Sequence, residues 1–250
     1  MNSANGQVCQ APTCTATDLC RAHIVPQGFA RALSGPGGHN RAVQADGSKP
    51  ANQPNGPFDT AILCAPCGKR LGTYDEYAIA FCAGLQPGRS EPTGRLFIHD
   101  TFDGERFARA MLAILWRASI SQRNEWAGVA LGPHEDRAAD LLFCDTPMAG
   151  QHLFEFALLR YASVELDTRK FVFLPIRIRS GAINMYALGV GGFMVLAKVD
   201  QRPFDAPMRR FVINGARRLE SAYLRFEETG EFAFFRDAAA QERARQGLVR

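Results

Sequence analysis

The sequence predicts an α+β protein in two parts: a small cysteine-containing N-terminal module and a larger C-terminal domain with an antiparallel sheet and helices. Two close cysteine pairs within the first 70 residues mark the module. Further along the chain, apolar residues at helical spacing alternate with short runs typical of strands. A stretch rich in glycine and proline separates the two parts, which we place at residues 1–85 and 94–250.

The composition is that of a folded protein. Of the 250 residues, 46% are hydrophobic, which is enough for a sizeable core and excludes global disorder. The net charge of +4 is too small to identify a nucleic-acid partner. No apolar run reaches the roughly 18 to 20 residues that a membrane-spanning helix needs. Since there is also no secretory leader and the cysteine count is odd, we expect a cytoplasmic protein with no membrane partner and no disulfide framework.

Four of the seven cysteines form the strongest chemical signal in the chain. Four residues separate Cys9 from Cys14, and two separate Cys64 from Cys67. Zinc takes four tetrahedral ligands and binds thiolates well, so two such pairs predict one structural Zn²⁺ site. Cys20 could replace Cys9 or Cys14 as a ligand. The alternative is that these cysteines are reduced thiols without a metal.

The first elements follow from the residues around these pairs. Residues 9–32 contain the first cysteine pair and the segment with His23. Glycine, proline and asparagine predict a long polar loop at 34–57, and residues 58–63 return as a short strand. A helix is predicted from Cys67 onward, with these apolar residues on one side: Leu71, Tyr74, Ala78 and Phe81.

The second part begins with helical signals. A strand is expected at 95–99, followed by a helix over 104–121 with Asp103 as its N-cap. A second helix is predicted over 134–143. The apolar run at 153–161 leaves helix and strand undecided.

Strands of an antiparallel sheet are predicted at 171–178 and 185–199, with Gly181 in the connection. The pattern over 207–226 is helical, with these apolar residues on one face: Met208, Phe211, Val212, Leu219, Tyr223 and Phe226. Both this segment and the helix over 104–121 carry arginines that could contact nucleic-acid phosphates. A solvated helix face explains them more simply. Along the earlier helix they are Arg106, Arg109, Arg117 and Arg123.

The order of the N-terminal features resembles the HNH endonuclease superfamily, whose ββα-metal fold contains a structural zinc. The segments Cys20-Arg-Ala-His-Ile-Val-Pro26 and Ile62-Leu-Cys-Ala-Pro-Cys-Gly-Lys-Arg-Leu-Gly72, with Tyr74-Asp-Glu-Tyr77, are similar to a group of bacterial and phage HNH-like proteins. The resemblance covers roughly residues 9–80. It implies a treble-clef zinc module and, for the whole protein, a role in defence or mobile-element biology.

The resemblance also implies metal-dependent cleavage of nucleic-acid phosphodiesters, with DNA favoured as the partner. His23 stands at the position of the general base that activates water, a role suited to a side chain that titrates near neutral pH. Asp59 stands five residues before Cys64, where the family usually has an asparagine that orients the base or the backbone. An aspartate at this position could orient the base or bind the metal. Asp75 and Glu76 are then the candidates to complete a Mg²⁺ or Mn²⁺ site.

Two positions depart from the family pattern. The residue before the base is normally an aspartate or histidine that binds the cation, and here it is Ala22. The residue after the last cysteine is often histidine or asparagine, and here it is Gly68. The alternative is therefore a zinc scaffold without catalysis that binds nucleic acid or protein, with a structural His23 and with Asp75 and Glu76 facing water. A third alternative is that the C-terminal domain has an unrelated activity.

Overall fold

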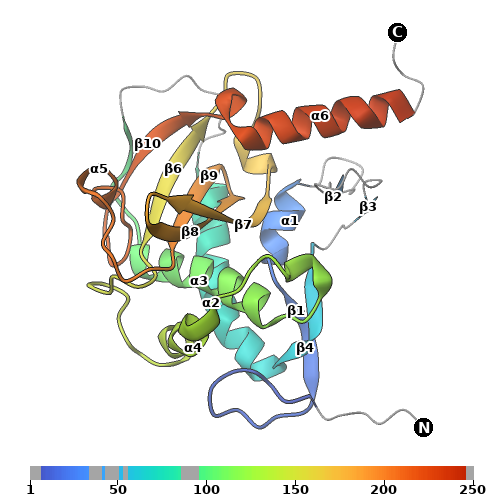
Figure 1. Ribbon diagram of the computed structural model, residues 1–250, viewed down its shortest axis with the longest axis vertical. Helices are drawn as coiled ribbons and strands as arrows, with labels where there is room; N and C mark the ends of the chain where they lie inside the picture. The colour runs from blue at the N-terminus through green and yellow to red at the C-terminus, as the bar shows by residue number, and fades with distance from the viewer. Residues whose placement is uncertain (1–6, 34–40, 43–50, 53–55, 86–95, 246–250) are drawn as a thin grey trace.

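The computed structural model describes residues 7–33, 41–42, 51–52, 56–85 and 96–245, which form an α+β fold (Figure 1). The N-terminal elements are β1 (Leu19–His23), α1 (Gln27–Leu33), β2 (Arg41–Ala42), β3 (Ala51–Asn52), β4 (Phe58–Cys64) and α2 (Ala65–Gly84). Those that follow are β5 (Leu96–His99), α3 (Gly104–Ile120), α4 (Glu135–Phe143), β6 (Phe156–Ala162), β7 (Phe173–Ser180), β8 (Ile183–Val190), β9 (Phe193–Lys198), α5 (Ala206–Arg209), β10 (Leu219–Arg225) and α6 (Gly230–Arg245).

Strands β1 and β4 form a small antiparallel sheet, and α2 follows β4 directly. The register places His23 opposite Phe58 and Ala22 opposite Asp59. Helix α2 begins two residues earlier than predicted because Pro66 lies in its first turn, where a missing N–H costs nothing. Its buried stripe follows helical spacing and consists of Leu71, Asp75, Ala78 and Cys82. The result is a strand–strand–helix unit, which we call the β1–β4–α2 unit.

The predicted polar loop at 34–57 lies mostly outside the described residues. Within it, β2 and β3 pair with each other in antiparallel orientation.

The larger sheet has the strand order β5-β10-β6-β9-β8-β7. Strands β6 to β9 are antiparallel neighbours, as the sequence predicts for 171–178 and 185–199. The undecided segment at 153–161 contributes β6. The expectation of a purely antiparallel sheet is wrong, because β10 runs parallel to β6.

The predicted helix over 207–226 is also wrong. Only one turn of helix forms, α5, and the chain then turns through Gly215, which has a φ of +75°, before entering β10. Strand β10 pairs with β5 on one side and β6 on the other. Hydrogen bonding to two neighbours outweighs helix propensity here, and the buried Leu219 and Ser221 follow the two-residue period of a strand.

Helix α3 lies at the centre, packed against α2 and against β9 of the larger sheet, and α2 in turn packs against β1 and β4 (Figure 1). Its predicted N-cap is confirmed, since the Asp103 carboxylate accepts a hydrogen bond from the N–H of Arg106 at 3.1 Å. The predicted second helix is confirmed as α4. The expected solvated arginine face is wrong in part, because Arg109 and Arg117 are only 7% and 4% exposed.

One hydrophobic cluster joins the two predicted parts of the chain. It includes Ile24 and Leu63 from the N-terminal segment and Phe107 and Phe193 from the C-terminal segment. Polar contacts add to this connection: the N–H of Asp103 donates to the Tyr77 hydroxyl at 2.6 Å, and Arg169 donates to the carbonyl of Leu85 at 2.7 Å. The β1–β4–α2 unit is therefore anchored on the same core as the larger sheet.

Candidate metal centre and the adjoining histidine

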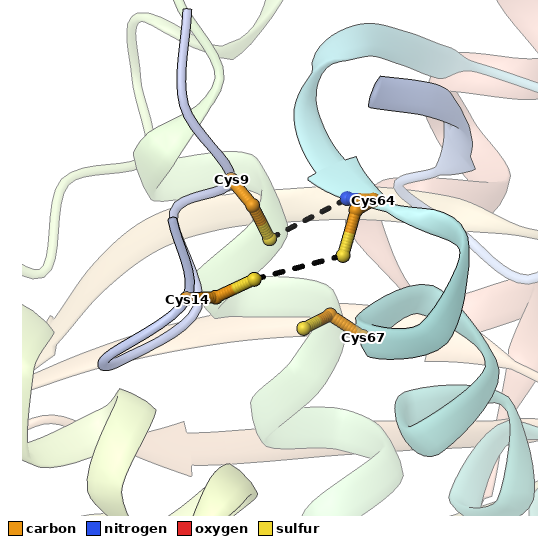
Figure 2. A group of neighbouring side chains, drawn as sticks. All are labelled: Cys9, Cys14, Cys64 and Cys67. Atoms are coloured by element: carbon orange, nitrogen blue, oxygen red, sulfur yellow. Dashed lines mark hydrogen bonds between the residues drawn. The ribbon is translucent and has the colours of Figure 1, made fainter. Parts of the chain in front are cut away.

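The four paired cysteines come together at one end of the β1–β4–α2 unit (Figure 2). The sulfur atoms of Cys9, Cys14, Cys64 and Cys67 all lie within 4.8 Å of one another. The Sγ atoms of Cys14 and Cys64 are 3.7 Å apart. Zn–S bonds of about 2.3 Å in a tetrahedron separate the sulfurs by about 3.8 Å. The cluster could therefore hold a metal ion such as zinc.

Two short backbone segments bring these sulfurs together. Cys64 ends β4 and Cys67 lies in the first turn of α2, so the second pair is fixed by the strand-to-helix junction. The first pair lies on a loop tied back by hydrogen bonds from the N–H of Cys9 to the carbonyl of Ala16 and from the N–H of Gln10 to the carbonyl of Ile62. The N–H of Cys64 also donates to the Cys9 sulfur at 3.4 Å, which links the two pairs directly.

The protonation of the thiols also bears on metal binding. The N–H of Cys67 lowers the pKa of the Cys64 thiol, whereas burial raises the pKa of Cys9 and of Cys67. Without a cation, the cluster favours ionisation of Cys64 over that of Cys9 and Cys67. A divalent cation would stabilise the other thiolates as well, because metal ligation requires deprotonated sulfur.

Cys20, the alternative ligand, is not part of this group. It lies on β1 opposite Leu63, and burial raises the pKa of its thiol.

His23 is the last residue of β1 and is half-buried. Its ring meets the Phe58 ring edge-on, with the centroids 6.1 Å apart. Its Nδ1 atom is buried and has no hydrogen-bond partner among the described residues. Burial lowers the pKa of His23, and the positive charges of Arg21 and Arg117 lower it further. The imidazole is therefore neutral near pH 7, as a general base must be.

Asp59 is buried, and both of its carboxylate oxygens accept structural hydrogen bonds. One carboxylate oxygen accepts the N–H of Ala61 at 2.8 Å, and the other accepts the hydroxyl of Ser121 at 2.6 Å. The second bond fastens the end of α3 to β4. Among the described residues, no hydrogen bond joins Asp59 to His23. The structure therefore does not show Asp59 orienting the predicted base.

Asp75 does not face water. It is 8% exposed, and its two oxygens accept hydrogen bonds from the guanidinium of Arg117 at 2.8 and 3.1 Å. The carboxylate is thus neutralised by an arginine of α3. Glu76, the next residue, is exposed. Of the two alternative residues predicted to complete a cation site, Asp75 is thus buried and paired, and Glu76 faces solvent.

Sequence reasoning missed the contribution of α3 to this region, namely Arg117 and Ser121. Two signals could have revealed the buried ion pair. Asp75 shares the helical stripe of Leu71 and Ala78, and Arg117 follows the apolar run 111–116 directly. A charged residue on each of two apolar helix faces suggests that the two are partners.

Comparison with known proteins gives no relative: no family model matches this chain, and no curated protein or solved structure matches it. Within the described part of the chain, none of the helices has the length and apolar character needed to span a membrane.

Proposed function

We propose that the protein cleaves nucleic-acid phosphodiesters, with one structural zinc in the four-cysteine cluster and His23 as the general base. The observation that carries the proposal is the β1–β4–α2 unit, with the cysteine cluster at its strand-to-helix junction and a neutral histidine at the end of β1. This is the order of elements that the HNH resemblance implies. Zinc, when bound, would crosslink the unit and take no part in cleavage.

The role of His23 follows from its surroundings. Nδ1 is enclosed and the residue is half-buried, so we assign the acceptance of the proton to Nε2. A neutral imidazole can accept the proton that this water loses as its oxygen attacks phosphorus. Arg21, the first of the arginines that lower the pKa of His23, is exposed and also favours the approach of a phosphodiester, because its charge is positive.

The residues present do not fit the Mg²⁺ or Mn²⁺ that the resemblance implies. Ala22 offers no ligand atom, Asp75 is paired with Arg117, and Asp59 is bonded to Ser121. Among the described residues, the four cysteines are the one group of three or more potential ligands that could hold an ion. The proposed cleavage therefore includes no step at a divalent cation, and cation dependence is left to the assay.

The second candidate is a nucleic-acid-binding scaffold without catalysis. Three observations favour it: Ala22 at the usual ligand position, the pairing of Asp75 with Arg117, and a His23 Nδ1 that has no hydrogen-bond partner in the described part of the chain. A general base normally has this second nitrogen held by an acceptor, which fixes its tautomer.

A cleavage assay separates the two candidates. Purified protein is incubated with supercoiled plasmid, single-stranded DNA and RNA, in Mg²⁺, Mn²⁺ or EDTA. His23→Ala should abolish cleavage while metal content and thermal unfolding stay unchanged, and His152→Ala is the matched control because its side chain is 60% exposed. Cleavage that survives in His23→Ala would remove the proposed base. A zinc-loaded wild-type protein that cleaves none of these substrates would favour the scaffold.

A further inference from the structure

Two arginines from distant parts of the chain lie over one aromatic ring beside His23. The guanidinium carbon of Arg21, on β1, is 4.4 Å from the centroid of the Phe58 ring. The guanidinium carbon of Arg123, just after α3, is 5.8 Å from the same centroid. Arg123 also donates to the carbonyl of Phe58 at 3.1 Å, which fixes its position. The same ring contacts His23 edge-on. These contacts place two cationic groups around one residue next to the proposed base.

The charges of these arginines are available to a ligand. Arg21 is exposed and takes part in no ion pair within the described residues. Arg123 contacts Glu125 through two nitrogens, Nε to one carboxylate oxygen at 3.2 Å and Nη2 to the other at 3.3 Å, but both side chains are more than a third exposed. Water screens an exposed pair, so a phosphate can compete with Glu125 for this guanidinium. Arg117, by contrast, is buried, and its two terminal nitrogens donate to the carboxylate of Asp75.

Stacking on an aromatic ring also holds a guanidinium in place for binding a phosphate. Arginine presents a planar fork of donors that matches a phosphate, and contact with an aromatic face restricts its motion before the ligand arrives. Two such groups around one ring can contact one phosphate or two neighbouring phosphates of a strand.

We propose that Arg21 and Arg123, braced by Phe58, form a phosphate-binding subsite that positions a polynucleotide backbone against His23. The inference rests on the proposed nucleic-acid substrate and names the residues that hold it. Arg21 and Arg123 are positioning residues, and His23 remains the group that meets the reacting atoms.

Binding is measured without cleavage, in the His23→Ala background, with a labelled DNA duplex over a range of salt concentrations. Each phosphate contact that is lost lowers the slope of log K against log salt by about 0.9, so Arg21→Ala with Arg123→Ala should lower it by about 1.8. Affinity at low salt should fall about tenfold. Arg21→Lys with Arg123→Lys keeps the charges and should keep the slope, while affinity falls because the flat stacking is lost.

The matched control is Arg177→Ala with Arg179→Ala on β7, which removes the same charge. Both residues are exposed and take part in no ion pair in the described part of the chain. The control should leave the slope near that of the parent. Equal effects of the two double variants would overturn the subsite, because binding would then depend only on net charge. A parent that does not bind the duplex, single-stranded DNA or RNA would overturn it as well.

The outcome is separable from that of the cleavage assay. Loss of binding confined to Arg21 and Arg123, in a protein whose wild type does not cleave, would keep the subsite and remove the catalytic role of His23. If the wild type cleaves and the arginine variant keeps its binding and its KM, the catalytic role of His23 would stand and the phosphate subsite would be removed. Metal content and thermal unfolding of each variant show whether the fold is intact.

Discussion

The β1–β4–α2 unit and the larger sheet accommodate buried polar groups in different ways. In the sheet, Lys198 is fully buried, and its ammonium pairs with Glu155 at 2.9 Å and donates to the carbonyl of Arg202. The protein thus supplies this charge with a carboxylate and a carbonyl of its own. In the small unit, four thiols gather in the geometry of a metal site. We therefore expect the sheet to be complete without a ligand and the small unit to depend on a bound ion.

The size of the two regions explains the difference. An isolated pair of strands is marginally stable in water, whereas six strands can cover a large apolar face. The larger sheet also lies against the buried helix α3, while the β1–β4 pair lies at the periphery (Figure 1). A metal crosslink contributes most where the apolar core is thinnest.

The largest expected effect comes from breaking the metal centre. Cys67→Ser should abolish binding of one zinc per chain and unfold the β1–β4–α2 unit before the larger sheet. Structural zinc contributes about 10–16 kcal/mol of binding free energy near neutral pH, and most of it would be lost. Zinc content after dialysis, with hydrogen exchange resolved by segment, measures both effects.

Cys144→Ser is the matched control, since Cys144 is exposed and is not part of the cluster. It should change the free energy of unfolding by less than about 0.5 kcal/mol. If the Cys67→Ser protein kept its zinc and its stability, the claim that the β1–β4–α2 unit depends on a bound ion would be wrong.

The next effect concerns the ion pair that joins the two regions. Arg117→Met leaves the Asp75 carboxylate buried without a partner and should cost about 3–5 kcal/mol in urea unfolding. Adding Asp75→Leu should recover most of this loss, because the burial of an uncompensated charge is then removed.

A surface pair provides the control for this measurement. Arg225 and Glu228 lie 3.8 Å apart and are 67% and 74% exposed, so Arg225→Ala should cost less than about 0.5 kcal/mol. A similar cost for Arg117→Met would mean that the buried pair contributes no more to joining the regions than a surface pair.

The sequence was informative where the relevant residues are close together in the chain. The spacing of Cys9 with Cys14 and of Cys64 with Cys67 predicted a cluster that the structure assembles. The pairing of Asp75 with Arg117 joins residues 42 positions apart, and no local pattern states which carboxylate an arginine will meet. The resemblance implied that the Asp75 carboxylate is free to bind a cation. Because α2 packs against α3, this carboxylate pairs with Arg117 instead.

The same limit explains the errors in the fold. Over 207–226, Leu219, Tyr223 and Phe226 have helical spacing, but the segment also has residues with strand spacing, such as Leu219 and Ser221. The neighbours decide between these patterns, and β10 has a partner on each side. A parallel pair such as β10 and β6 joins segments about 60 residues apart, which periodicity alone cannot reveal.

The smallest effect is the pH dependence due to His23. Its pKa in the folded protein lies below the usual value, through burial first and then through Arg21, Arg117 and Arg31, with Asp75 opposing them. The unfolded chain keeps a pKa of about 6.5 and so binds more protons at acidic pH. The contribution of the neutral His23 ring to the free energy of unfolding is therefore present above about pH 6.5, and it is lost as pH falls toward the lowered pKa.

NMR titration of the imidazole tests this sign. Arg21→Ala should raise the pKa of His23 by removing a nearby positive charge, whereas Arg177→Ala on β7 should leave it unchanged. The fall in unfolding midpoint between pH 7.5 and 5.5 should be smaller in His23→Gln than in the wild type. A His23 pKa above the usual value would contradict the positive surroundings on which the phosphate subsite depends.

The most direct test of the account is X-ray absorption at the zinc edge of the purified protein. We predict one zinc per chain with four sulfur neighbours at about 2.3 Å, and loss of this signal in Cys67→Ser but not in Cys20→Ser. A protein without bound metal, or a zinc with nitrogen and oxygen neighbours, would contradict the claim that the four cysteines hold the β1–β4–α2 unit together.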